Sequence, residues 1–154
     1  MADLIPEIRI AVRALILQDD KVLLQHKVYE NGDERYTLPG GAAEPGEPLE
    51  QGLMRECLEE IGAQVSVQEM VCVADLFKRK KQLINTIQQQ VEILFRCEVP
   101  LNYTPRNGKK PDKHQVAVAW KDIDSIREQF FPQGLLKIVA DPGKTHPTYL
   151  GLIK

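Results

Sequence analysis

The distribution of apolar and polar residues predicts β-strands in the first part of the chain. Residues 8–17 and 21–28 are rich in β-branched and other apolar side chains, and Asp19-Asp20 supplies a tight-turn signal between them. We expect these two strands to pair antiparallel. A short extended segment at residues 36–38 follows a second turn signal at residues 30–33. Residues 39–46 contain too much Gly and Pro for regular structure, so we expect a loop there.

The clearest alternation of apolar and polar positions covers residues 86–99 and has the period of a half-buried strand. Its polar face includes Glu92, and that face lies either at a functional site or in plain solvent. Further strands are predicted over residues 64–77, ending in a basic hairpin tip at 78–81, and over 114–120. A polar loop is expected at 100–113, and helices at 122–130 and 135–140, before a tail that contains Pro and Gly. Strands outnumber helices, so the predicted fold class is α+β, a mixed sheet with helices packed on it.

A helix with an acidic face is predicted over residues 47–61. Pro48 is well tolerated at a helix start, and Gly62 is a helix stop. On a helical wheel, three carboxylates share about one third of the circumference; they are Glu56, Glu59 and Glu60. A second arc forms the expected core stripe; its members are Leu53, Met54, Cys57, Leu58 and Ile61.

Like charges three and four residues apart repel on a helix, so the acidic face needs compensation. Arg55 can pair with Glu59, which leaves Glu56 and Glu60 facing each other. Either a hard divalent cation neutralises them, since Mg²⁺ and Mn²⁺ prefer carboxylate oxygens, or the face is simply solvated.

Composition and charge narrow the function classes. The 154 residues fit one domain over residues 1–154, and 20 Lys and Arg against 22 Asp and Glu give a net charge of −2. No global positive field draws the chain to nucleic acid or anionic lipid, so nucleic acid is not an expected partner. Three cysteines without a C-x-x-C spacing suggest neither a disulfide framework nor a zinc site. The start has no signal-peptide pattern and no apolar run suits a membrane span, so a cytoplasmic protein is expected.

The acidic helix belongs to a longer motif. From Gly41 the chain reads G-x5-E-x7-R-E-C-x-E-E-x-G-A, ending at Ala63. This resembles the Nudix box, G-x5-E-x7-R-E-U-x-E-E-x-G-U, in which U is a bulky apolar residue. Every fixed residue matches, and only the apolar positions Cys57 and Ala63 are smaller than usual. Residues 36–41 and 120–123 also resemble segments that flank the box in that family.

The resemblance implies a Nudix fold, an α/β/α sandwich around a mixed β-sheet flanked by helices. It also implies hydrolysis of nucleoside diphosphates linked to another moiety, with Mg²⁺ as the cofactor and Mn²⁺ as a substitute. By the same resemblance the metal ligands are Glu56, Glu59, Glu60 and the Gly40 carbonyl, while Arg55 and Glu47 hold the helix and loop in place. Glu56, or an acidic residue outside the box, deprotonates the attacking water.

Several features outside the box stay open. Many relatives supply a fourth carboxylate from beyond the box, and Glu92, Glu98 and Asp112 are all candidates. Arg9 and Arg13, which project from one face of the first strand, are either substrate contacts or surface residues, and Gly41 is a further candidate contact. The basic stretches at 78–81 and 106–110 either attract phosphate or are solvated loops.

The expected partner is a small nucleoside diphosphate derivative, and no downstream residue selects among the subfamilies. A ligand-sensing Nudix domain without activity, and hydrolysis at an RNA end, are the alternatives. The sequence leaves the oligomeric state open, with a homodimer as one alternative.

Overall fold

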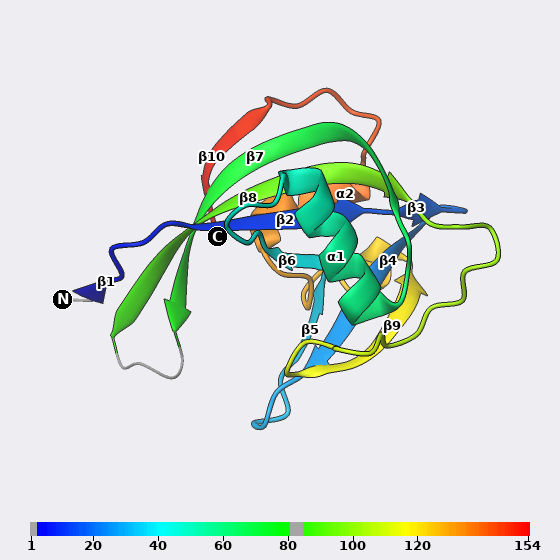
Figure 1. Cartoon of the computed structure of the whole chain (residues 1–154), viewed down its shortest axis with the longest axis horizontal. Helices are drawn as coiled ribbons and strands as arrows, with labels where there is room; N and C mark the ends of the chain where they lie inside the picture. The colour runs from blue at the N-terminus through cyan, green and yellow to red at the C-terminus, as the bar shows by residue number, and fades with distance from the viewer. Residues whose placement is uncertain (1–2, 81–84) are drawn as a thin grey trace.

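The computed structural model describes residues 3–80 and 85–154 (Figure 1). Ten strands are assigned within these residues: β1 (Asp3–Leu4), β2 (Arg9–Leu15), β3 (Leu17–Gln18), β4 (Lys21–Val28), β5 (Glu34–Thr37), β6 (Gly40–Ala42), β7 (Ser66–Lys80), β8 (Thr86–Glu98), β9 (Gln115–Lys121) and β10 (Tyr149–Ile153). The two α-helices assigned there are α1 (Leu49–Ile61) and α2 (Leu136–Ala140), and short 3₁₀ turns cover Ile123–Ser125 and Gln133–Leu135.

The strands of the described residues form two sheets. A six-stranded mixed sheet has the order β10-β7-β8-β2-β6, with β1 added on β8. Within it β2 runs parallel to β8, whereas β7 and β8 form a long antiparallel hairpin. The second sheet is antiparallel and has β4 paired with β3, β5 and β9. The predicted mixed sheet is therefore confirmed, and a second sheet accompanies it.

The first two predicted strands pair differently from the expectation. β2 belongs to the mixed sheet, and only the two-residue β3 forms a hairpin with β4, at Leu17↔Val22 and Gln18↔Lys21. The chain thus crosses from one sheet to the other near Ile16. Both residues of the tight turn, Asp19 and Asp20, have positive φ, as a two-residue hairpin turn requires.

Two hydrophobic cores lie on opposite faces of the mixed sheet, one under each helix (Figure 1). Alternate side chains of a strand point to opposite faces, so β2 contributes to both. Val12 and Ala14 pack in the core with Leu53 of α1, whereas Leu15 packs in the core with Ile138 of α2.

Helix α1 has the predicted extent but a narrower buried face. Pro48 is its N-cap, and Gly62, with φ of 65°, is its left-handed C-cap. Leu53, Cys57 and Ile61 are fully buried. Met54 and Leu58 were expected in the core stripe but are about half exposed, because only one edge of the apolar arc contacts the sheet.

Four further expectations are corrected. The loop predicted over 39–46 contains β6, which pairs with β2. The helix predicted over 122–130 is only a 3₁₀ turn, because residues 129–131 hydrogen-bond to Tyr36 of β5 instead of continuing a helix. The tail contains β10, which pairs parallel with β7. Lys78 to Lys80 belong to β7 and do not form a hairpin tip, while residue 81 lies outside the described residues.

Candidate active site

Arg55 lies at the centre of the acidic face of α1. Its Nε and Nη2 donate to the two carboxylate oxygens of Glu47 at 3.0 and 2.7 Å, and Nη2 also donates to the Ala42 carbonyl at 3.1 Å. Its Nη1 donates to Glu56 and Glu59 at 3.1 and 3.3 Å. Because a bidentate pair fixes orientation, Arg55 ties the loop before α1 to the helix, which fits its expected organising role. These hydrogen bonds lower the pKa of Glu47 to about 2.

Two glycines allow the loop to approach both β2 and α1. Gly40 has φ of 140°, and a Cβ there would lie 1.9 Å from the Val12 carbonyl oxygen. A Cβ on Gly41 would lie 2.6 Å from Oε2 of Glu56. Gly41, a candidate substrate contact, is thus placed against Glu56, and any side chain at this position would displace that carboxylate.

Glu60 is held by buried glutamines of the second sheet, and the pKa of its carboxyl is raised. Its Oε2 accepts a hydrogen bond of 2.5 Å from Gln25, a fully buried side chain of β4. Gln25 is itself held by Gln115, and Nε2 of Gln115 also donates to the Glu60 carbonyl at 2.8 Å. Burial, together with the nearby charges of Glu56 and Asp112, raises the pKa of Glu60 to about 7. An excess of negative charge is therefore concentrated at this end of the helix.

The loop after β8 caps the C-terminal end of α1. The backbone amides of Gly108 and Lys110 donate to the carbonyls of Glu60 and Glu59 at 2.9 and 2.8 Å. Arg106 donates to the Gly62 carbonyl at 2.6 Å. A helix C-terminus carries partial negative charge, which a guanidinium stabilises. The basic stretch at 106–110 is thus accounted for by helix capping.

The three candidates for a fourth carboxylate have different environments. Glu98 is exposed at the end of β8, opposite Ser66. Asp112 accepts a 2.6 Å hydrogen bond from Lys27 and is one of the charges that raise the pKa of Glu60. Glu92 is only 2% exposed and accepts from Arg13 at 3.0 Å and from Gln90 at 2.9 Å.

A solvent-facing Glu92 is therefore excluded. β8 lies between β2 and β7, and its central residues are covered on both faces, which an alternation pattern alone does not reveal. Arg13 is its buried counter-ion, not a surface residue: burial lowers the pKa of Arg13, but Glu92 more than offsets this and the net change is upward.

The donor set of the acidic face suits a hard divalent cation, because it gathers three carboxyl groups on one face of α1 and such cations prefer carboxylate oxygens. In residues 3–80 and 85–154, no three His, Cys, Asp or Glu side chains are already arranged to hold a metal ion. Glu56 and Glu59 turn toward Arg55, and Glu60 turns toward Gln25. By the chemistry of its donors the site fits Mg²⁺ or Mn²⁺, with Arg55 and Gln25 competing for the same oxygens.

Comparison with known proteins decides the family. The model of the NUDIX domain matches residues 7–141. The chain belongs to the Nudix hydrolase family. A MutT-like protein of Streptomyces ambofaciens is 31% identical over 121 residues, covering 78% of this chain and 68% of that protein.

Solved structures agree with this assignment. A NUDIX hydrolase from Nitrosomonas europaea has a TM-score of 0.69 at 25% identity and covers 92% of this chain and 93% of its own. An ADP-ribose pyrophosphatase from Streptococcus suis shares the fold, with a TM-score of 0.55 at 22% identity and coverage of 94% and 98%. The expected Nudix fold is thus confirmed. Within the described part of this Nudix hydrolase, no helix is long and apolar enough to cross a membrane.

Sequence reasoning missed the polar partners that surround the Nudix box. Gln25 and Gln115 contact Glu60, and Lys27 holds Asp112, yet each lies in a strand or beside one with no motif around it. The one available signal for such a partner was a glutamine within an apolar strand, because a buried amide needs a hydrogen-bond partner.

Proposed function

We propose that this Nudix hydrolase uses a divalent cation to cleave the pyrophosphate linkage of a nucleoside diphosphate joined to another moiety. The observation that carries the proposal is the gathering of Glu56, Glu59 and Glu60 on one face of α1, beside Gly40 and Gly41, which have no side chains. We also expect a cytoplasmic location, because Cys57, Cys72 and Cys97 are free and buried.

When bound, Mg²⁺ would neutralise the pyrophosphate and lower the pKa of an attacking water. Glu56 is the proposed general base. Its Oε1 accepts from Arg55, whereas its Oε2 faces the space beside Gly41, so Oε2 can take the water proton. Gln25 orients Glu60, and the fork from Arg55 to Glu47 holds the glycine loop in place.

Of the three candidates outside the Nudix box, Asp112 is the proposed fourth carboxylate. Its charge acts on Glu60, whereas Glu98 is exposed at the end of β8, opposite Ser66. Glu92 is already neutralised by a buried guanidinium and serves as a structural counter-ion to Arg13.

The test is a product-resolved assay of nucleoside triphosphates, nucleotide sugars, dinucleoside polyphosphates and a 5′-triphosphate RNA. Each is incubated with Mg²⁺, Mn²⁺ or EDTA. We expect metal-dependent cleavage between phosphorus atoms of at least one small substrate, and its loss in Glu56→Gln. Cleavage in EDTA, or cleavage of the RNA alone, would contradict the proposal.

A further inference from the structure

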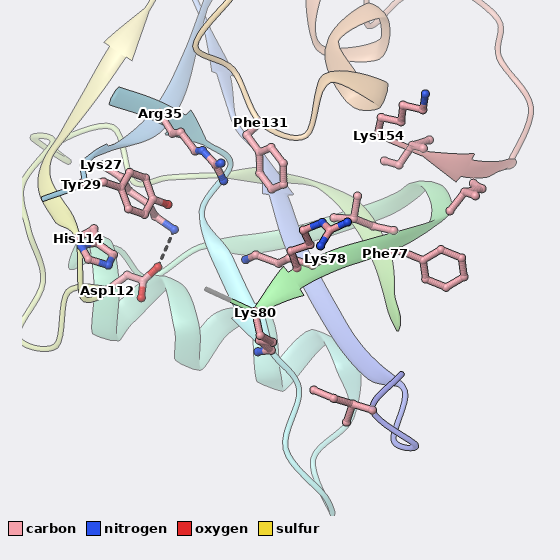
Figure 2. A pocket seen from close by; sticks show the side chains of 15 residues that line it. Lys27, Tyr29, Arg35, Phe77, Lys78, Lys80, Asp112, His114, Phe131 and Lys154 are labelled. Carbon is pink, nitrogen blue, oxygen red and sulfur yellow. Dashed lines mark hydrogen bonds and ion pairs between the residues drawn. The ribbon is translucent and has the colours of Figure 1, made fainter. Parts of the chain in front are cut away.

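A cavity of about 1040 Å³ has a charged lining that is mostly cationic (Figure 2). Asp112 is the one carboxylate among its described lining residues, and it is paired with Lys27. The cationic lining residues come from β4, β5, β7 and the C-terminal end; they are Lys27, Arg35, Lys78, Arg79, Lys80 and Lys154. The backbone amide of Asp112 donates to Oε1 of Gln115 at 3.4 Å, and Nε2 of Gln115 donates to the Glu60 carbonyl at 2.8 Å, so the cavity adjoins the proposed catalytic carboxylates.

Lys27 is the one of these cations that has a carboxylate partner in the described part of the chain. None of the ion pairs found within residues 3–80 and 85–154 includes Arg35 or Lys78. Lys78 is nevertheless largely withdrawn from water. Burial, together with the charges of Arg13, Lys27 and Arg9, lowers the pKa of Lys78 to about 8. Cations crowded together away from water favour an anionic ligand.

Arg9 of β2 supplies a further buried donor near Lys78 and Lys80. Side chains at even positions of β7 share the face that carries Leu76, so Lys78 and Lys80 continue that face beyond the core. Arg9 of β2 is close enough to lower the pKa of both lysines. Its Nε is buried and has no hydrogen-bond partner within the described residues. A buried donor without a partner is costly, and a ligand oxygen would satisfy it.

Two of the aromatic rings that line this cavity contact cations. The Arg35 guanidinium lies over the rings of both Tyr29 and Phe131, with its Cζ 5.2 and 4.6 Å from the centroids. The Nζ atom of Lys78 lies 5.9 Å from the centroid of the Phe131 ring. Tyr29 and Phe131 therefore already hold cations on their ring faces. The rings instead orient Arg35, whose planar donors suit phosphate.

We infer that this cavity binds a phosphoryl group of the substrate additional to the scissile diphosphate, with Arg35 and Lys78 as its principal contacts. The inference rests on the proposed function and narrows its substrate class. Substrates with a third phosphoryl group are preferred over those whose second moiety is an uncharged sugar.

The first experiment measures binding without metal or turnover. Inorganic tripolyphosphate is titrated calorimetrically into the protein in EDTA. We expect binding that weakens about tenfold in Lys78→Gln and in Arg35→Gln, since each loses a charge-assisted contact. Lys78→Arg keeps the charge and should retain most of the affinity. Lys137→Gln and Arg127→Gln, at exposed positions outside this cavity, are the matched controls and should bind like the wild type. Melting curves of all variants identify any that fail to fold.

The second experiment compares kcat/KM for a nucleoside triphosphate and a nucleotide sugar. Lys78→Gln should lower kcat/KM about tenfold for the triphosphate, mainly through KM, and leave the sugar substrate nearly unchanged. Equal losses for both substrates, or tripolyphosphate binding that is absent or indifferent to Arg35 and Lys78, would overturn the inference. If no diphosphate is cleaved, the proposed function fails, and the metal-free titration still decides whether the cavity binds phosphate.

Discussion

The acidic face of α1 and the neighbouring cationic cavity carry opposite charges, and neither is balanced within the chain. One guanidinium, Arg55, contacts the carboxylates of Glu47, Glu56 and Glu59. The side chain of Glu60 forms no ion pair within the described residues and accepts its hydrogen bond from the amide of Gln25. In the cavity, the rings of Tyr29 and Phe131 are the described partners of Arg35. Lys78 has no ion pair within the described residues, and the one carboxylate whose charge acts on it, Glu92, is already paired with Arg13. Each region therefore needs a partner of the opposite sign, and a polyanionic substrate with a divalent cation supplies both.

The basic stretches at 78–80 and 106–110 have similar compositions but different roles in the structure. In 106–110, Arg106 and two backbone amides cap the carbonyls of α1. In 78–80, Lys78 lines the cavity, partly buried, and forms no ion pair within the described residues. Charge density along the sequence thus identifies neither role, and the local surroundings determine both.

The largest effect is expected at Glu56. Glu56→Gln should lower Mg²⁺-saturated turnover by about 10²–10⁴-fold, as loss of a general base typically does. It removes one bond to Arg55 but relieves repulsion with Glu60, so metal-free stability should change by only a few tenths of a kcal/mol. Steady-state kinetics and thermal melting of the same sample measure both quantities.

Glu50→Gln is the matched control, because Glu50 is exposed in the first turn of the same helix. Its turnover should equal that of the wild type. A Glu56→Gln protein that melts far lower yet keeps its turnover would assign Glu56 a structural role.

The second-largest effect is expected at Arg55, which links α1 to the preceding loop through Glu47. Arg55→Ala should lower the free energy of unfolding at pH 7 by about 1.5–3 kcal/mol, the range for hydrogen bonds to charged groups. Because the pKa of Glu47 is depressed to about 2, its share of this stability is present above its ordinary 4.5. That share is lost as pH falls from 4.5 toward 2.

Urea unfolding of wild type and Arg55→Ala across this pH range measures the difference. The gap between the two proteins should shrink below pH 4.5. A gap that stays constant down to pH 2 would show that Glu47 is not the partner that matters.

The smallest effect is expected at the helix cap. Arg106→Ala should lower the free energy of unfolding by about 1 kcal/mol, because the Gly62 carbonyl loses its donor. KM for any substrate should not change. Lys109→Ala, an exposed neighbour, is the control for both readouts. A raised KM in Arg106→Ala, comparable to that of Lys78→Gln, would remove the distinction between the two basic stretches.

Local patterns predicted the elements whose signals are local. The glycine at residue 62 stops α1, and the periodicity of residues 86–99 matches β8. Patterns failed where a distant segment decided the outcome. The apolar spacing of residues 122–130 suits a helix, but the chain there forms turns and ends in a bridge between Phe130 and Tyr36. β10 exists because β7 offers it an edge.

In the candidate site, too, local spacing predicted some residues, whereas others depend on contacts between distant segments. The Nudix box placed Arg55 and the acidic residues on one helix, because their spacing is local. The partners of Glu60 come from two strands of another sheet, and no local pattern links Gln25 to Gln115. The burial of Glu92 likewise follows from the central position of β8, which depends on sheet order.

The most direct test of the central claim is calorimetric titration of Mn²⁺ into the wild type and Glu60→Gln, without substrate. The variant loses one charged oxygen ligand but keeps an amide that Gln25 can still contact. We predict one or more Mn²⁺ sites in the wild type and at least about tenfold weaker binding in the variant, a difference of 1.4 kcal/mol. Identical titration curves would contradict the assignment of the α1 carboxylates as the metal site.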